Sequence, residues 1–393
     1  MISSATTRQF IKEHLHDDVK ELALQAQKYP DVDMPSAITQ IAGRQLAADK
    51  IPSWNAIDSL LYPKHLPMEQ CSSEATANYK ASVLKGDTLV DLTGGFGIDC
   101  AFISRNFANA VYVERQTELC ELAKHNFPVL GLSHIQVINS DGVEYLHQMN
   151  PVDCIFLDPA RRNEHGGKTV AIADCEPNAV ELSSLLQSKA NKVMIKLSPM
   201  LDLSLAIHDL PDTDEVHIVS VANECKELLL ILNKEKQQEV TIHCINIGKD
   251  DTLQKFSFTR SKEQEIVCTY AQQVGKYLYE PNSSILKAGA YKSIAKAYKI
   301  DKLHPNSHLY TSNTYISDFP GRVFETKSIF TLNKKEVKNN LSGIEKANIT
   351  VRNFPASVAE LRKRLKLKDG GEVYLFATTL ADEQKVLIKC LKP

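Results

Sequence analysis

The sequence contains no uninterrupted apolar run of about 18 residues or more, which is the length that a membrane-spanning helix needs. Its first residues, Met1–Phe10, also lack the apolar core of a secretory signal peptide. We therefore expect a cytoplasmic protein that neither crosses a membrane nor carries a cleaved signal.

The nine cysteines are scattered, with no C-x-x-C pair and no cluster of His and Cys at the spacing of metal ligands. This pattern supports neither a disulfide framework nor a zinc site. We expect the cysteines to be free, buried, small apolar residues in a reducing compartment, and we expect no metal ion in the site.

The chain of 393 residues is longer than one hydrophobic core normally serves, so we expect two or three domains. Its charge is unevenly distributed. Residues 281–393 hold 20 Lys+Arg against 10 Asp+Glu, which leaves 26 against 38 in the rest of the chain. An anionic partner and a merely solvated basic surface explain this asymmetry equally well.

The first two regions of the chain differ in their hydrophobic pattern. Residues 1–70 read as short helices separated by prolines, and residues 71–238 alternate strand and helix as in a doubly wound α/β sheet. Within the second region we predict strands at 88–92, 110–113, 135–138, 153–157, 193–197, 216–221 and 227–232. The last two should form an antiparallel hairpin, because their link is too short for a parallel crossover.

The remaining chain divides into a connecting region, 239–319, and a tail, 320–393. The connecting region should contain a hairpin followed by a polar helical stretch from 262 to about 300. The tail is predicted to be a small, separate α/β domain. Its elements are expected as a strand at 323–332, a helix at 334–341, a strand at 348–353, a helix at 357–367, and strands at 373–379 and 385–391.

Acidic residues stand at or just after the ends of four predicted strands, in the order Asp91, Glu114, Asp141 and Asp158. The first of them leads into a glycine loop with glycines at 94, 95 and 97, where the backbone can approach a ligand without a Cβ clash. In an open parallel sheet, ligands bind beyond the carboxyl ends of the strands. The sequence therefore predicts a binding site at this edge of the sheet.

This order of strand-end acids resembles that of class I S-adenosylmethionine methyltransferases. The resemblance implies a Rossmann-like sheet that binds S-adenosyl-L-methionine. It also implies that Glu114 accepts hydrogen bonds from the ribose hydroxyls and that Asp141 accepts one from the adenine amino group. The expected cofactor-binding residues are Asp91, Thr93, Gly95, Gly97, Glu114, Asp141, Gly142, Ser73 and Glu74. For Ser73 and Glu74, a helix cap is an equally good interpretation.

A dinucleotide-binding fingerprint is the rival interpretation of the glycine loop. It fails at Cys100, where the G-x-G-x-x-G pattern needs a small residue for close packing of helix on strand. It also leaves the motif Asp158-Pro159-Ala160-Arg161 unexplained. We therefore expect the adenosyl cofactor and not NAD.

The motif at 158–161 resembles the D/N-P-P-[YF/R] catalytic loop of amino- and nucleobase methyltransferases. The resemblance implies catalytic roles for Asp158, Pro159 and Arg161, with Asp158 orienting the acceptor. Ala160 replaces the second proline and Arg161 stands where an aromatic residue would stack, so the target atom is left open. A rigid turn with a capping Asp is the structural alternative.

The same four residues also resemble the loop of RNA uracil-C5 methyltransferases, which use a nucleophilic cysteine after the next strand. Here that strand ends in Lys196-Leu197-Ser198-Pro199, with Leu197 in place of the cysteine, so covalent catalysis is disfavoured. Lys196 is interpreted as a surface lysine with an extended side chain, in preference to a contact with the acceptor's phosphate.

The tail resembles the THUMP-like module of a family of class I methyltransferases, in motifs at 280–290, 304–310 and 319–322. Region 239–319 would then be a ferredoxin-like connecting region. The resemblance implies an RNA partner, and the tail offers a cationic face for phosphates at Arg352, Arg362, Lys363, Arg364, Lys366 and Lys368.

The sequence thus predicts methylation of a nucleobase in rRNA or tRNA by direct methyl transfer. The alternatives are a methyltransferase acting on protein or a small molecule, and a non-catalytic RNA-binding protein that retains the fold. The sequence does not fix the oligomeric state.

Overall fold

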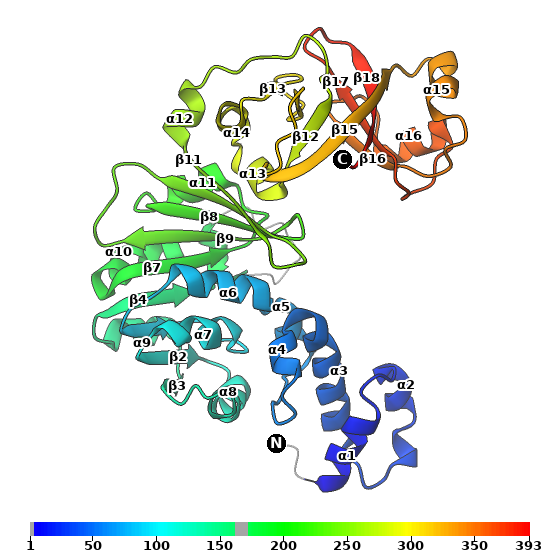
Figure 1. Cartoon of the computed structure of the whole chain (residues 1–393). Helices are drawn as coiled ribbons and strands as arrows, with labels where there is room; N and C mark the ends of the chain where they lie inside the picture. The colour runs from blue at the N-terminus through cyan, green and yellow to red at the C-terminus, as the bar shows by residue number, and fades with distance from the viewer. Residues whose placement is uncertain (1–3, 162–171) are drawn as a thin grey trace. The chain divides into compact units, whose positions relative to one another are not determined.

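The computed structural model describes residues 4–161 and 172–393 (Figure 1). The chain forms two compact units. The first comprises Met1–Glu215 with Lys226–Gln238, and the second comprises Val216–Cys225 with Glu239–Pro393.

The first unit opens with short helices, as the proline spacing predicts. Their bounds are α1 (Ala5–Glu13), α2 (Val19–Leu24), a 3-10 turn at Ala26–Lys28, α3 (Met34–Lys50), α4 (Pro52–Asn55) and α5 (His65–Gln70). Side-chain caps start three of them, because Ser4, Asp18 and Asp33 each accept hydrogen bonds from the first-turn backbone amides. A core containing Phe10, Leu22 and Ile41 holds α1, α2 and α3 together.

The rest of the first unit is a mostly parallel sheet with the order β9-β7-β4-β1-β2-β3. The strands are β1 (Thr88–Asp91), β2 (Asn109–Glu114), β3 (Ile135–Asn139), β4 (Val152–Leu157), β7 (Ala190–Leu197) and β9 (Glu224–Asn233). Only β9 is antiparallel to its neighbour in this set, β7. Helix α6 (Glu74–Val83) precedes β1. The α-helices that follow it in this unit are α7 (Ile98–Ile103), α8 (Thr117–Val129), α9 (Gly142–Gln148), α10 (Ala179–Lys189) and α11 (Leu203–Asp209).

The predicted Rossmann-like sheet is confirmed, and the order reverses at β1, where the chain crosses first to β2 and later to β4. Such a switch point is where open α/β sheets bind ligands. The expected hairpin at the end is also confirmed: β8 (Glu215–Val221) leads into β9 through Ala222 and Asn223, both at positive φ. This is the backbone of a two-residue hairpin turn.

The N-terminal helices support the glycine loop of the sheet. The rings of Trp54 and Tyr62 lie 5.4 Å and 6.0 Å from the ring of Phe96 in that loop. Asn126 of α8 exchanges hydrogen bonds of 3.0 Å and 2.8 Å with the backbone of Leu61. The helical region therefore packs against the candidate ligand-binding edge.

The second unit contains the hairpin β10 (Thr241–Ile247) and β11 (Leu253–Thr259), followed by α12 (Arg260–Glu265). Its seven-stranded sheet has the order β13-β14-β12-β15-β18-β17-β16. The strands are β12 (Tyr277–Pro281), β13 (Asp301–Lys302), β14 (Tyr310–Ser312), β15 (Gly321–Phe330), β16 (Asn348–Arg352), β17 (Tyr374–Thr379) and β18 (Lys385–Leu391). Its helices are α13 (Ser283–Ala288), α14 (Tyr291–Tyr298), α15 (Lys334–Leu341) and α16 (Val358–Leu365).

The prediction of a helical stretch from 262 to about 300 is wrong for the middle of that stretch. Helix α12 ends at Glu265, and residues 277–281 form β12, with Leu278 and Tyr279 both buried. The elements predicted for 320–393 are all present. However, β15 pairs with both β12 and β18, so strands on the two sides of the expected boundary at 319/320 share one sheet.

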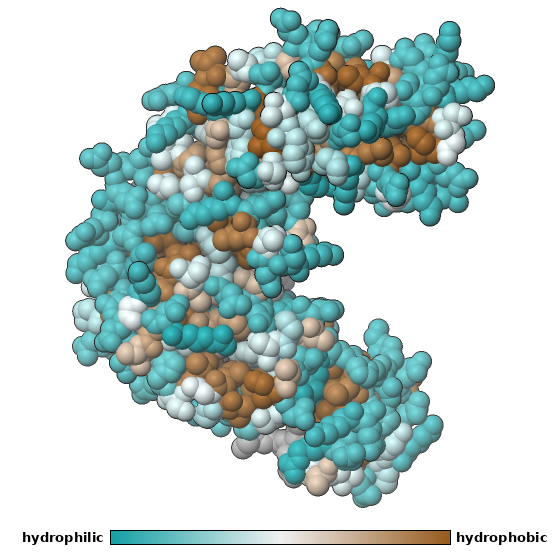
Figure 2. Space-filling model, in the orientation of Figure 1, coloured by the Kyte–Doolittle hydropathy of each residue, from teal (hydrophilic) through white to brown (hydrophobic). Residues whose placement is uncertain are grey.

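On the face drawn in Figure 2, hydrophilic residues cover most of the surface and apolar residues lie between them in separate patches. Among residues 4–161 and 172–393, no helix is long and apolar enough to cross a membrane.

Candidate active site

The glycine loop between β1 and α7 is shaped by Tyr112 of β2. A Cβ at Gly94 would lie 2.2 Å from the Tyr112 ring, and the Tyr112 hydroxyl donates a hydrogen bond of 2.5 Å to the Gly95 carbonyl. Gly95 and Gly97 have φ values of +54° and +88°, which favour glycine. Among residues 4–161 and 172–393, apart from the chain neighbours of Gly95, only the Thr93 carbonyl oxygen lies within 4 Å of a Cβ built on Gly95, at 3.8 Å, so these residues leave open space beside the loop.

Glu114, at the end of β2, is tied to this loop. Its two carboxylate oxygens accept hydrogen bonds from the Gly95 amide at 2.9 Å and the Gln116 amide at 2.8 Å. Each carboxylate oxygen has further acceptor capacity. Glu114 can therefore both hold the loop and accept hydrogen bonds from a ligand, although only 8% of its surface is exposed.

Asp91, at the end of β1, is almost fully buried. Its Oδ1 accepts a hydrogen bond of 3.0 Å from the Thr93 amide, while its Oδ2 has no hydrogen-bond partner among the described residues. Burial raises the pKa of Asp91 well above its usual value, and the carboxylates of Asp99, Asp158 and Glu114 add to the rise. A buried carboxyl oxygen without a hydrogen-bond partner at this edge indicates that a ligand group forms a hydrogen bond with it.

Asp141 and Gly142 both have structural roles at the start of α9. The Asp141 side chain caps the helix, accepting hydrogen bonds from the amides of Val143 at 2.8 Å and Glu144 at 3.2 Å. A Cβ at Gly142 would lie 2.2 Å from the Leu92 carbonyl oxygen. Close packing of α9 on the end of β1 thus explains this glycine. The predicted contacts of both residues with adenine stay predictions.

Ser73 and Glu74 lie at the start of α6. Ser73 is its N-cap, and Glu74 accepts a hydrogen bond of 2.9 Å from the Ser53 amide at the start of α4. The helix-cap interpretation is therefore confirmed for Ser73. A cofactor contact by either residue stays a prediction.

Asp158 follows β4 beside the glycine loop, as expected. Its backbone amide donates a hydrogen bond of 2.7 Å to the Thr93 hydroxyl, which joins the loops after β1 and β4. Its side chain is 36% exposed, and the adjacent Pro159 is buried. The backbone of Arg161 pairs with Cys175 in the short β5–β6 ribbon (Ala160–Arg161 and Cys175–Glu176), while its side chain lies outside the described part of the chain.

Lys196, the penultimate residue of β7, contacts Asp158 directly. Its Nζ lies 2.5 Å from Asp158 Oδ2 and 3.7 Å from Asp99 Oδ2, and its side chain is 13% exposed. The interpretation of Lys196 as a surface lysine is wrong, because two carboxylates at the sheet edge hold its ammonium group inside the site. The signal was present in the sequence as a single lysine within the otherwise apolar run of residues 193–197.

A second buried lysine joins these charged side chains, and no sequence pattern indicates it. Lys80 of α6 is fully buried, with its Nζ 2.8 Å from each carboxylate oxygen of Glu227 on β9. It also lies 3.1 Å from Asp99 Oδ1 and 3.1 Å from the Ser72 hydroxyl. The Ser72 hydroxyl in turn donates a hydrogen bond of 2.7 Å to Asp99 Oδ2.

The network contains two ammonium groups and three carboxylates: Lys80, Lys196, Asp99, Glu227 and Asp158. Burial opposes the ionisation of Asp99, yet the two ammonium groups and the Ser72 hydroxyl lower its pKa below the usual value. Burial also opposes the charge of Lys196, but Asp158 and Asp99 outweigh it and raise its pKa. Burial raises the pKa of Glu227, and Lys80 opposes that rise. With all five groups ionised, the network carries one net negative charge.

All nine cysteines are free. Cys100, next to Asp99 on α7, is buried, and burial raises the pKa of its thiol well above the usual value. A thiol of raised pKa is a poor nucleophile at neutral pH.

The basic side chains of the tail, in the second unit, are partly paired. Arg352 lies 3.0 Å from the buried carboxylate of Glu280, and Arg362 forms an ion pair with Asp369. Helix α16 ends at Leu365, short of the predicted 367, because Lys366 adopts the left-handed conformation that terminates it. Lys366 and Lys368 therefore follow the helix instead of forming part of its face.

Three family models match the chain. One described as conserved hypothetical protein 95 matches residues 63–184, one described as a ferredoxin-like domain matches residues 277–320, and one described as THUMP domain-like matches residues 321–392. The crystal structure of a candidate methyltransferase from Porphyromonas gingivalis W83 is 36% identical to this chain. The match covers 100% of both chains with a TM-score of 0.88.

Two curated relatives match a smaller part of this chain. A protein-L-isoaspartate O-methyltransferase from Koribacter versatilis (strain Ellin345) is 29% identical over 103 residues, and one from Thermotoga maritima is 32% identical over 76 residues. The matches cover 25% and 19% of this chain, which spans 46% and 24% of the lengths of these relatives.

The mostly parallel sheet that reverses its order at a glycine loop, together with these matches, shows that the chain has the fold of a class I methyltransferase. The chain belongs to the family of class I methyltransferases with a C-terminal THUMP-like domain, together with the Porphyromonas gingivalis protein.

Proposed function

We propose that this protein uses S-adenosyl-L-methionine to methylate a nucleobase in RNA, either rRNA or tRNA, by direct transfer without a metal or a covalent enzyme intermediate. The observation that carries the proposal is the Asp158–Lys196 ion pair beside the glycine loop, in a family of methyltransferases that carries a THUMP-like domain.

The residues at the sheet edge fit the adenosyl cofactor. Gly95, with open space beside it, lets the backbone approach the cofactor, and Gly97 shapes the loop through its positive φ. Glu114 accepts hydrogen bonds from the ribose hydroxyls, and the unpartnered Oδ2 of Asp91 forms a hydrogen bond with one of the cofactor's polar groups. Asp141, Gly142, Thr93, Ser73 and Glu74 complete the proposed cofactor site. When bound, the cofactor supplies an electrophilic methyl group.

Asp158 positions the acceptor in this proposal. A carboxylate next to an exocyclic amine accepts its hydrogen bond and directs the nitrogen lone pair toward the methyl group. Lys196 fixes one Asp158 oxygen by ion pairing, and Pro159 stiffens the turn. The net negative charge of the buried network favours the positive charge that develops on the acceptor.

In this proposal, each of four regions of the chain has its own role. Residues 1–70 support the glycine loop, 71–238 carry out the transfer, 239–319 connect, and the basic residues 320–393 contact RNA. The weak likeness to isoaspartate methyltransferases motivates the second candidate, a methyltransferase that acts on protein.

Comparison of modified nucleosides tests the proposal. RNA from a deletion strain should lack one methylated nucleoside that wild-type RNA contains, and the purified protein with labelled cofactor should restore it. The Asp158→Ala variant should fail to restore it. Labelling of protein fractions with no labelling of any RNA would favour the second candidate and contradict the RNA substrate.

A further inference from the structure

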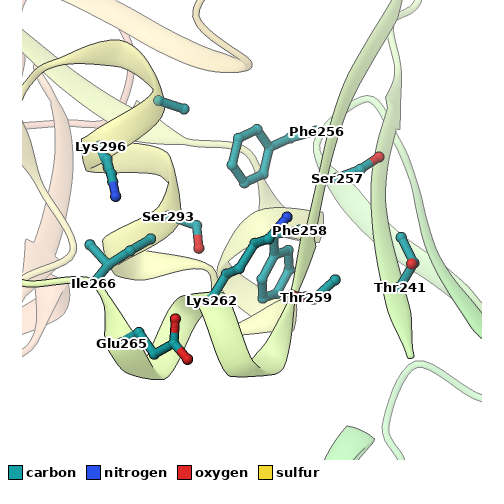
Figure 3. Close-up of a pocket in the computed structure, with 11 residues that line it drawn as sticks. Thr241, Phe256, Ser257, Phe258, Thr259, Lys262, Glu265, Ile266, Ser293 and Lys296 are labelled. Carbon is teal, nitrogen blue, oxygen red and sulfur yellow. The ribbon is translucent and has the colours of Figure 1, made fainter. Parts of the chain in front are cut away.

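The second unit contains a cavity of about 780 Å³ that has no part in the active site described above. It lies between β11, α12 and α14, and all its lining residues belong to this unit (Figure 3). Its volume falls within the range of about 300–1,000 Å³ that is typical of small-molecule sites.

One wall of the cavity is aromatic. Phe256 and Phe258 occupy alternate positions of β11, so both rings point to the same side, and their centroids lie 6.2 Å apart with an interplanar angle of 22°. Phe258 is buried, whereas Phe256 is half-buried and lies 6.5 Å from the ring of Tyr298. Phe256 therefore offers a flat aromatic surface on which a planar ring can stack.

The opposite wall presents a hydroxyl that lacks a partner. Ser293 of α14 is 7% exposed, and its Oγ has no hydrogen-bond partner among the described residues. Figure 3 shows this hydroxyl pointing into the cavity. The helix around it is fixed, because Glu263 accepts hydrogen bonds from the amides of Lys292 at 2.8 Å and Ser293 at 2.7 Å. A buried hydroxyl held without a partner indicates a ligand that supplies one.

Charged side chains from the two helices also line the cavity. Lys262 and Glu265 of α12 and Lys296 of α14 are exposed, so the lining has two ammonium groups against one carboxylate. An aromatic face, a fixed hydroxyl and two ammonium groups together match the three parts of a nucleotide: the base, its polar edge and the phosphates on either side.

We propose that this cavity binds one unpaired nucleotide of the RNA substrate, with the base on Phe256, a polar edge at Ser293 and the flanking phosphates at Lys262 and Lys296. The proposal rests on the RNA substrate of the proposed function and adds a site, outside the active site, that selects single-stranded RNA.

The test measures binding of a fluorescent single-stranded decaribonucleotide to the full-length chain by anisotropy, with adenosine monophosphate as a second ligand. Phe256→Leu keeps apolar volume but removes the stacking surface, and should weaken decaribonucleotide binding about 5- to 150-fold. Lys262→Gln with Lys296→Gln should lower the slope of log affinity against log salt by about 0.7 for each lost phosphate contact.

Ser293→Ala is the variant that separates binding from folding. It removes a hydroxyl that has no partner in the described protein, so the melting temperature should stay unchanged or rise while RNA binding weakens. Lys255→Gln serves as the matched control for the lysines, since Lys255 is exposed on β11 but does not line the cavity. It should leave binding and salt slope unchanged.

Each outcome is decisive. Undiminished RNA binding by both Phe256→Leu and Ser293→Ala would overturn the cavity as an RNA site while leaving the proposed function intact. Adenosine monophosphate binding as tightly as the decaribonucleotide would assign the cavity to a free nucleotide and overturn the RNA proposal. Failure of the unaltered chain to bind the decaribonucleotide, together with no labelling of any RNA in the transfer assay, would remove the proposed function as well.

Discussion

Lys80 is fully buried, and its ammonium group contacts the carboxylates of Glu227 and Asp99. Breaking a buried ion pair by removing one partner typically costs about 3–5 kcal/mol, because the other charge remains buried. Lys80→Met should therefore lower the free energy of unfolding by about that amount in urea titrations. The double variant Lys80→Met with Glu227→Gln should recover part of the loss, and a single variant as stable as the parent would contradict this arrangement.

Asp91 should make the stability of the protein depend on pH. Its pKa is raised in the folded state above the ordinary 3.8, so its contribution to stability is fully present below pH 3.8 and declines as the pH rises toward the folded pKa. Asp91→Asn stays neutral and retains the acceptor for the Thr93 amide, so it should remove that decline. Urea unfolding at a series of pH values should show that the free energy of unfolding of the variant rises relative to that of the parent as the pH rises from 4 to 7. A constant difference across the series would contradict the burial argument.

Lys196 is a positioning residue in this account, acting through Asp158. Lys196→Met should reduce methyl transfer by up to about 100-fold, because Asp158 loses the partner that fixes it. The affinity for S-adenosylhomocysteine should change little, since the Lys196 ammonium contacts Asp158 and Asp99. Lys196→Arg should restore part of the activity, and Lys192→Met, on the same strand away from the site, should leave it unchanged. Equal rates for the parent and Lys196→Met would show that the ion pair does not position the acceptor.

At the scale of elements, the sequence predicted the structure wherever the pattern was local. All seven strands expected between 88 and 232 are present, because each is a short apolar run that ends at an acid, a glycine or a turn. The stretch from 262 to about 300 is predicted from the sequence to be polar and helical. Leu278 and Tyr279 become a strand there through pairing with β14 and β15, whose residues lie about 30 to 45 positions later in the chain.

The residues of the candidate site also differ in whether a local sequence pattern predicts them. Asp91, Glu114 and Asp158 could be predicted because each stands at or just after the end of its own strand in sequence. Lys80 and Glu227 could not, since 147 positions separate them and only the folded sheet brings them together. The buried network at the site is thus a property of the tertiary structure.

Helix α16 is the element on which the tail's contact with RNA can be tested. Lys363 and Arg364 are exposed, whereas Arg362 is engaged with Asp369. Reversing the charge of Arg362, Lys363 and Arg364 should weaken RNA binding and lower the salt slope by about 0.7–0.9 for each lost phosphate contact. Filter binding across a salt series measures this, with Lys385→Glu on β18 as the control. An unchanged slope in the triple variant would remove this helix from the RNA surface.

This charge reversal is a sharper test than removing residues 320–393. Strand β15 of the tail pairs with β12, so the truncation would take four strands out of a seven-stranded sheet. A loss of RNA binding in the truncated protein would then reflect unfolding of the second unit as readily as loss of a contact.

At the scale of the whole molecule, cofactor binding and RNA binding are assigned to different units. The residues proposed to hold the cofactor all lie in the first unit, and the excess of basic residues lies between 281 and 393, in the second. Changes in the tail should therefore leave cofactor affinity intact, and changes at Glu114, which is proposed to contact only the cofactor, should leave RNA affinity intact.

Titration calorimetry with S-adenosylhomocysteine tests the central claim, that the strand-end edge of the first unit holds the adenosyl cofactor. The unaltered protein should bind this ligand and not NAD. Glu114→Ala should weaken binding by about 1.5–3 kcal/mol, the range for hydrogen bonds to a charged acceptor. Binding of NAD with no binding of S-adenosylhomocysteine would contradict the account.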